Sequence, residues 1–363
     1  MSIGTDRQNA EPDVVAPGGR RGQLERQGQL PRWTTPAVLA AAAVVVGAVL
    51  AVAGFSTGLF VVATVVLFAV GLYALSRTVE GRRKATDRLV TIIVTSAFLL
   101  ALVPLISVIA TVVGFGLPRF DAEFFTSSMR GIVGEGGGIY HALMGTLIIT
   151  ALASLISIPV GVLTAVYLVE YGKGRLARAI TFFVDVMTGI PSIVAGLFAV
   201  ALFTLLLGPG ARLGLAGAVA LSVLMIPVVV RSTEEMLKIV PNELREASFA
   251  LGVPKWRTIL KVVIPTSIGG IASGITLAIA RIIGETAPLL VTVGITTGTN
   301  LNPFDGRMAT LPVFAYYAYT QPGVPVEPSQ DRAWAAALLL IIIVMLLNLV
   351  ARGIARLFAP KTR

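Results

Sequence analysis

The sequence contains no cysteine and one histidine, and only 13% of its 363 residues are charged. The absence of cysteine excludes a disulfide scaffold, a thiolate metal site and a cysteine nucleophile. A single histidine argues against a histidine-based metal or acid–base site. An ordinary soluble domain carries about 25% charged residues. This composition therefore argues against a soluble globular protein.

What the chain has instead is apolar sequence, with 55% hydrophobic residues. A helix needs about 20 apolar residues to cross roughly 30 Å of hydrocarbon. The apolar stretches are long and continuous, unlike the short alternating strands of membrane barrels. They predict an all-α polytopic membrane protein with about eight spans, at residues 37–54, 58–76, 89–113, 141–170, 179–207, 214–230, 265–295 and 333–351.

The formal charge of +10 is explained by the membrane without any nucleic acid. If the N-terminus is cytoplasmic, the inside segments hold 23 lysines and arginines and the outside loops hold five. Cytoplasmic loops of membrane proteins carry such an excess. The asymmetry predicts a multi-pass protein of the cell membrane with both termini in the cytoplasm.

The same pattern divides the chain into five parts. The first apolar pair contains no ionisable group, which favours an accessory hairpin for packing and anchoring. The predicted parts are a disordered cytoplasmic tail (1–36), the accessory hairpin (37–76), a cytoplasmic linker (77–88), a six-span core (89–351) and a basic cytoplasmic tail (352–363).

A cytoplasmic segment between the sixth and seventh spans has the pattern of a short helix. Asn242 is a candidate N-cap and Gly252 a candidate stop, with acidic residues in the first turn. The segment is too polar to enter lipid. Taken alone, it is compatible with an ordinary amphipathic surface helix.

The spacing of this segment resembles the EAA loop of ABC importer permeases. The matching residues are Glu246-Ala247-Ser248, then Gly252 after three residues, and Pro265 at the end of the pattern. The resemblance implies a helix that fits a cleft on an ATP-hydrolysing subunit. The chain lacks a Gly-x-x-x-x-Gly-Lys-Ser/Thr loop, so ATP and Mg would be bound by separate subunits.

Two ionisable residues fall inside the seventh predicted span. Arg281 and Glu285 are four residues apart, which on a helix places them on one face and within pairing distance. One interpretation is a structural ion pair. The other is that Arg281 presents its planar donors to a passing oxyanion while Glu285 holds it in place.

Further polar residues complete the predicted substrate path. Asp185 lies in the fifth span, shortly before Pro191 and Ser192, where a kink would expose carbonyl and hydroxyl groups. Thr286 follows Glu285. His141, at the outer end of the fourth span, is more typical of a polar anchor than of a ligand. The outer loop 296–332 is aromatic and suits either an interfacial belt or a short helix over the path.

Four segments in this order resemble the phosphate-specific ABC importer permeases of the PstA type. They are Ile190–Val194, Pro227–Met236, the EAA-like loop and Arg281–Leu290. The resemblance implies a permease without catalytic residues or a metal site. It also implies a heterodimer with a PstC-like permease, two ATP-binding subunits and an extracytoplasmic phosphate-binding protein.

The residues alone leave other functions open. A permease for sulfate, molybdate or phosphonate is the nearest alternative, because an arginine in a pathway does not choose among oxyanions. An ion-coupled secondary transporter would also place charges at membrane depth, but it would not need a cytosolic docking helix.

Overall fold

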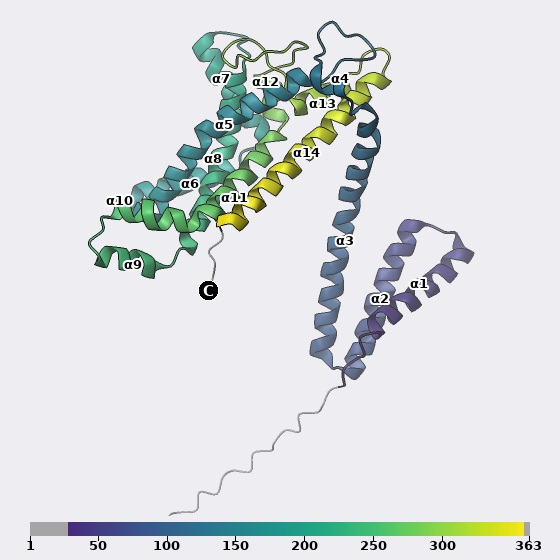
Figure 1. The fold of residues 1–363 in the computed structure, drawn as a ribbon. Helices are drawn as coiled ribbons and strands as arrows, with labels where there is room; N and C mark the ends of the chain where they lie inside the picture. The colour runs from purple at the N-terminus through teal and green to yellow at the C-terminus, as the bar shows by residue number, and fades with distance from the viewer. Residues whose placement is uncertain (1–27, 359–363) are drawn as a thin grey trace, which may run out of the picture. The chain divides into compact units, whose positions relative to one another are not determined.

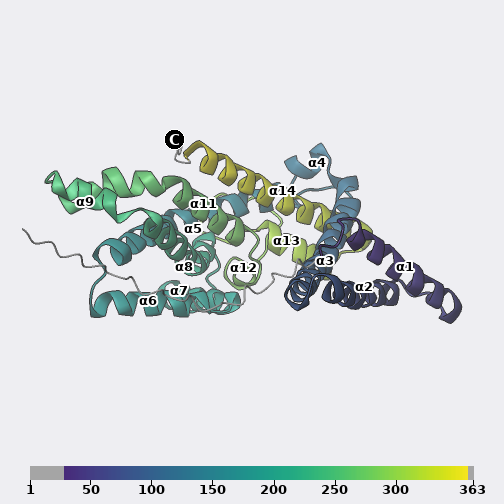
Figure 2. The same cartoon turned by 90° about the horizontal axis from the view of Figure 1, so that it is seen from below.

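The computed structural model describes residues 28–358, and this part of the chain is helical without strands (Figures 1 and 2). It divides into two compact units, with the boundary after Ile106 inside one long helix, α3 (Arg82–Gly116). Most of the predicted tail (residues 1–27 of 1–36) and the end of the basic tail (359–363) lie outside the described residues. The predicted fold class, an all-α polytopic membrane protein, is confirmed.

The first unit contains a helical hairpin at the place predicted for it. Helices α1 (Thr34–Ala53) and α2 (Thr57–Val79) pack against each other and are joined by a short turn. Most of their large apolar side chains are exposed, as expected for helices that lipid surrounds. The predicted linker 77–88 is helical except at a two-residue break, Glu80-Gly81.

The break is held by Glu80, whose side chain is almost completely buried. Its carboxylate accepts hydrogen bonds from the Leu30 N–H at 3.0 Å and the Ser76 hydroxyl at 2.8 Å, and pairs with Arg88 at 2.7 Å. Burial alone would raise the pKa of Glu80. The hydrogen bonds and the positive charge outweigh it and lower the pKa from 4.5 to about 2.

A carboxyl group whose pKa is lower in the folded than in the unfolded state stabilises the folded state at pH values above its unfolded pKa. This stabilisation is lost as the pH falls through the range between the unfolded and the folded pKa. The fluorescence of Trp33, with Trp256 and Trp334 replaced by phenylalanine, should therefore stay constant from neutral pH to about 4.5 and change between about 4.5 and 2. Glu80→Gln should remove that transition. The same titration curve in both proteins would show that Glu80 does not hold the junction.

The second unit, residues 107–358 as described, is a bundle around α5 (Tyr140–Val166) and α8 (Gly214–Ile239). Glycines allow the close packing: a Cβ added to Gly161 would lie 2.7 Å from Val229, and one on Gly274 would lie 2.6 Å from Ser232. Small residues at such positions let membrane helices approach closely. Helix α11 (Ile264–Ile283) packs beside α8, and α14 (Glu327–Phe358) packs against α11.

Shorter helices lie at the two ends and along one side of this bundle. Figure 1 shows α9 and α10 at one end of the unit and α4 and α13 at the other. The remaining helices are α4 (Ala122–Thr126), α6 (Arg175–Thr188), α7 (Ser192–Leu207), α9 (Asn242–Ala250), α10 (Lys255–Thr258), α12 (Ala287–Thr292) and α13 (Leu311–Thr320). Single turns of 3₁₀ or π-helix occur at Leu117–Arg119, Tyr167–Tyr171 and Ile259–Val263.

Seven helices within the described residues are long and apolar enough to cross a membrane, and α6 with α7 would make an eighth span. This pair is bent by 108° where the sequence predicted a kink at Pro191. Val184 of α6 packs with Leu237 near the end of α8, whereas Phe203 of α7 packs with Leu213 just before its start. The pair therefore runs from one end of α8 to the other.

The seventh predicted span, 265–295, is wrong in its extent. Helix α11 ends at Ile283, Gly284 breaks it, and the separate helix α12 begins at Ala287. Pro288 lies in the first turn of α12, where a missing N–H costs nothing, and it favours a new helix start. Residues 284–295 are thus a turn and a short helix rather than the end of a span.

Candidate functional site

The predicted docking helix is present as α9, at one end of the second unit. Its stop is as predicted: Gly252 follows the helix with a φ of +72°, a left-handed conformation that glycine adopts without strain. Its start differs from the prediction. Asn242 is the first helical residue rather than the N-cap, and its Oδ1 accepts a hydrogen bond from Arg245 at 3.2 Å.

Arg245 fastens α9 to the ends of two long helices. It forms an ion pair of 2.9 Å with Glu170 in the π-helical turn after α5. It also donates to the carbonyl oxygens of Leu237 at 3.0 Å and Val240 at 2.6 Å, at the end of α8. The carbonyl of Glu170 accepts a further hydrogen bond from Lys255. These contacts join α9 to the ends of α5 and α8.

A second contact joins α9 to the helix that follows it. Ser248 is buried and its hydroxyl lies 2.8 Å from that of Thr258 in α10. Pro265 then occupies the first turn of α11, where its ring fits the helix start. The chain from α9 to α11 is therefore one connected unit.

The outer surface of α9 is exposed, judged by the described residues alone. Glu246 and Ala247 are exposed. Leu251 is 83% exposed, and Leu244 and Phe249 are also exposed. Apolar side chains on a polar helix outside the bundle are typical of a protein-binding surface.

Asp185, the predicted path residue of α6, belongs to a network of ion pairs. Its carboxylate pairs with Arg231 of α8. Arg231 also pairs with Glu234 at 2.8 Å, and Glu234 pairs with Lys238 at 2.7 Å. Two acids and two bases thus form a chain that links α6 to the second half of α8.

The ion pair between Arg281 and Glu285, one of the two interpretations of the sequence, is not among the ion pairs of the described residues. Because α11 ends at Ile283, Glu285 is not on the helix, and its backbone N–H closes a turn onto the Ile282 carbonyl. Arg281 is exposed, beside Leu277 at 59% exposure, and takes part in none of the ion pairs found in residues 28–358. Its guanidinium is available to an anion or to another subunit.

The other two predicted path residues lie at helix starts. Ser192 is the first residue of α7, and Thr286 directly precedes α12. Helices α7 and α12 touch, since a Cβ added to Gly196 would lie 2.7 Å from the Pro288 Cα. The fold therefore brings α7 and α12 together. Among the described residues, no ion pair joins Arg281 to either element.

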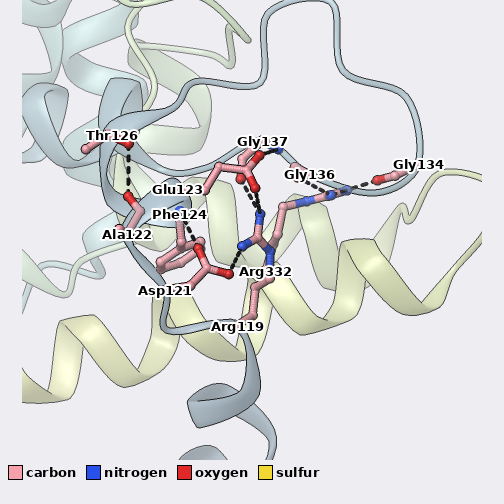
Figure 3. Close-up of polar contacts among 10 residues, drawn as sticks. All are labelled: Arg119, Asp121, Ala122, Glu123, Phe124, Thr126, Gly134, Gly136, Gly137 and Arg332. Carbon is pink, nitrogen blue, oxygen red and sulfur yellow. Dashed lines mark hydrogen bonds and ion pairs between the residues drawn. The ribbon is translucent and has the colours of Figure 1, made fainter.

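At the end of the bundle opposite α9, two arginines bind one glycine-rich loop (Figure 3). Arg119 pairs with Asp121 and donates to the Gly137 carbonyl at 2.7 Å. Arg332 of α14 donates to the carbonyls of Gly134 at 2.8 Å and Gly136 at 2.9 Å. The hydrogen bond from the Phe124 N–H lowers the pKa of Asp121, and the hydrogen bond and positive charge of Arg119 lower it further.

Sequence reasoning missed most of the charged partners. The signal for Arg231, Glu234 and Lys238 was their spacing of three and four residues on a helix, which allows pairing. No sequence signal connects Arg245 to Glu170, which is 75 residues away. In the described part of the chain, no three His, Cys, Asp or Glu side chains are grouped so as to hold a metal ion.

Comparisons with known proteins identify relatives of this chain. The family described as binding-protein-dependent transport system inner membrane component matches residues 157–363. The phosphate transport system permease protein PstA 1 of Mycobacterium tuberculosis (strain CDC 1551 / Oshkosh) is 47% identical over 292 residues, covering 79% of this chain and 94% of the relative. PstA of Mycobacterium leprae is 48% identical over 278 residues, covering 75% and 90%.

A more distant relative and a solved structure were also found. PstA of Pasteurella multocida is 38% identical over 280 residues, covering 77% of this chain and 96% of the relative. A solved inward-facing structure of the MetNI methionine ABC transporter is 24% identical, with a TM-score of 0.47, covering 62% of this chain and 95% of the other.

Proposed function

We propose that this chain, which belongs to the family of binding-protein-dependent transport system inner membrane components, is a permease subunit of an ATP-driven importer of inorganic phosphate. Helix α9 carries the proposal: an exposed helix fastened by Arg245 to the ends of α5 and α8 is the element such a subunit needs to receive work from an ATPase. Phosphate is supported by the names of relatives 47% and 48% identical over three quarters of the chain.

The proposed assembly has four kinds of subunit. This chain pairs with a PstC-like permease, two cytosolic subunits bind ATP and Mg, and an extracytoplasmic protein delivers phosphate. An arginine facing lipid costs about 2.5–3.5 kcal/mol on insertion scales. The exposed Arg281 therefore supports a second permease against this face, with the translocation path between the two.

In this assembly α9 is cytoplasmic, and both termini lie on the same side as α9. A reporter fused after Arg363 and one inserted near Ser128 should then lie on opposite sides of the membrane. Five crossings separate them if α6 and α7 together make one span. Cysteine labelling at both sites tests this, with a cysteine near Gly174 as the inside control. Labelling of both sites from the same side would contradict the eight-span topology.

The function is tested by copurification followed by transport. When the chain is purified in mild detergent, a second permease and two ATPase subunits should copurify with it. Proteoliposomes containing this assembly and the binding protein should take up labelled phosphate only when ATP is present on the side of the membrane where the ATP-binding subunits lie. Sulfate, molybdate and phosphonate are the competitors. Uptake of one of these in preference to phosphate would contradict the substrate, and uptake driven by an ion gradient without ATP would contradict the class.

A further inference from the structure

A pocket lies at the end of the bundle opposite α9, apart from the predicted path residues. Its volume is about 280 Å³, close to the small end of ligand sites. Residues of three helices and three loops line it. The lining includes His141 of α5, Tyr317 of α13, Arg332 of α14 and the loop residues Thr297 and Gln321.

Arg332 lines this pocket, and three of its five N–H donors make no hydrogen bond among the described residues. It is 5% exposed, yet it is in none of the ion pairs of the described chain. Only its Nη1 donates to the glycine loop, as Figure 3 shows, and Nε is buried without a partner. Nε and Nη2 form the edge of the guanidinium that binds a carboxylate or phosphate through two parallel hydrogen bonds.

A second buried group in the same pocket also lacks a partner. His141 is 1% exposed, and its Nδ1 makes no hydrogen bond. Its ring packs edge-on against Phe314 at 5.5 Å, which fixes its orientation. Buried polar groups in proteins are almost always hydrogen-bonded, and a buried charge without a partner is costly. Both groups point to a ligand that accepts hydrogen bonds and carries negative charge.

We propose that this pocket is a binding site for a tetrahedral oxyanion, held by Arg332 and His141 at the extracytoplasmic entrance of the translocation path. The identity of the anion, inorganic phosphate, rests on the proposed function. The site is separate from Arg281 and the Asp185–Arg231 pair, so phosphate binds here before it enters the path. A phospholipid headgroup presents the same chemistry and is distinguished by experiment.

The test measures binding of labelled inorganic phosphate to the purified transporter without its binding protein. Gln321 is exposed, and its side chain makes no hydrogen bond among the described residues, so Gln321→Glu should fold normally. It places a negative charge at the pocket and should raise the Kd about tenfold. Asn302→Asp adds the same charge at an exposed position that does not line the pocket and should leave the Kd within about twofold.

Arg332→Gln separates binding from structure. If Arg332 only clamps the glycine loop, this variant lowers the Tm and leaves the Kd unchanged, which overturns the proposal. Equal Kd values for Gln321→Glu and Asn302→Asp also overturn it. A third outcome would also overturn it. If phosphatidylglycerol raises the Tm of the wild type but not of Gln321→Glu, and both proteins bind phosphate equally, a lipid fills the pocket. If Gln321→Glu weakens phosphate binding but the whole assembly takes up no phosphate, the binding site is supported and the proposed function is contradicted.

Discussion

Replacing Arg281 with glutamine should lower phosphate uptake by about 10- to 100-fold while the assembly remains as stable as the wild type. Hydrogen bonds to a charged group contribute about 1.5–3 kcal/mol, and each 1.4 kcal/mol is a factor of ten. Stability should not fall, because Arg281 has no ion-pair partner within residues 28–358 that the change would leave buried and uncompensated. Uptake by proteoliposomes and the Tm of the assembly are the two measurements.

Two further variants sharpen this result. Arg281→Lys keeps the charge but loses the planar donors, so it should restore uptake only in part. Arg130→Gln removes a charge from an exposed loop and should have little effect. If Arg281 had a structural role through Glu285, Arg281→Gln would lower the Tm and the double variant with Glu285→Gln would restore both Tm and uptake. That pattern would contradict a role in the anion path.

The long elements of the fold were predictable because lipid imposes a simple rule on sequence. A span must be apolar over about 20 residues, so α1, α2, α5 and α8 appear directly as hydrophobic runs. Hydropathy cannot show where such a run breaks. The run from 265 to 295 is continuous in composition, but Gly284 and Pro288 divide it into α11 and α12.

The candidate site was predictable only where its geometry is local. Helix α9 depends on a stretch of about ten residues and one glycine, so the helix and its stop were predicted correctly. The Arg281–Glu285 pair was a local inference as well, but it assumed an unbroken helix and failed with that assumption. The Asp185–Arg231 pair and the Arg332 pocket join elements that are distant in sequence, and no spacing rule reaches across them.

Replacing Arg245 with methionine should uncouple ATP hydrolysis from transport and destabilise the end of the bundle. Arg245 and Glu170 have side chains only 13% and 6% exposed, so the change leaves a buried carboxylate without its partner. Removing one member of a buried ion pair costs about 3–5 kcal/mol. The carbonyls of Leu237 and Val240 lose their donor as well. We expect a lower Tm, and ATPase activity that no longer rises when the loaded binding protein is added.

The double variant Arg245→Met with Glu170→Leu tests whether the Arg245–Glu170 contact only stabilises the fold or also couples α9 to transport. Replacing both charges by apolar side chains should recover much of the Tm, because a well-packed apolar pair is often as stable as a buried ion pair. Stimulation of the ATPase should stay low, because the hydrogen bonds from α9 to the end of α8 remain absent. Lys261→Met removes an exposed positive charge from the neighbouring turn and should change neither quantity. Full recovery of stimulation in the double variant would mean that α9 transmits movement through some other contact.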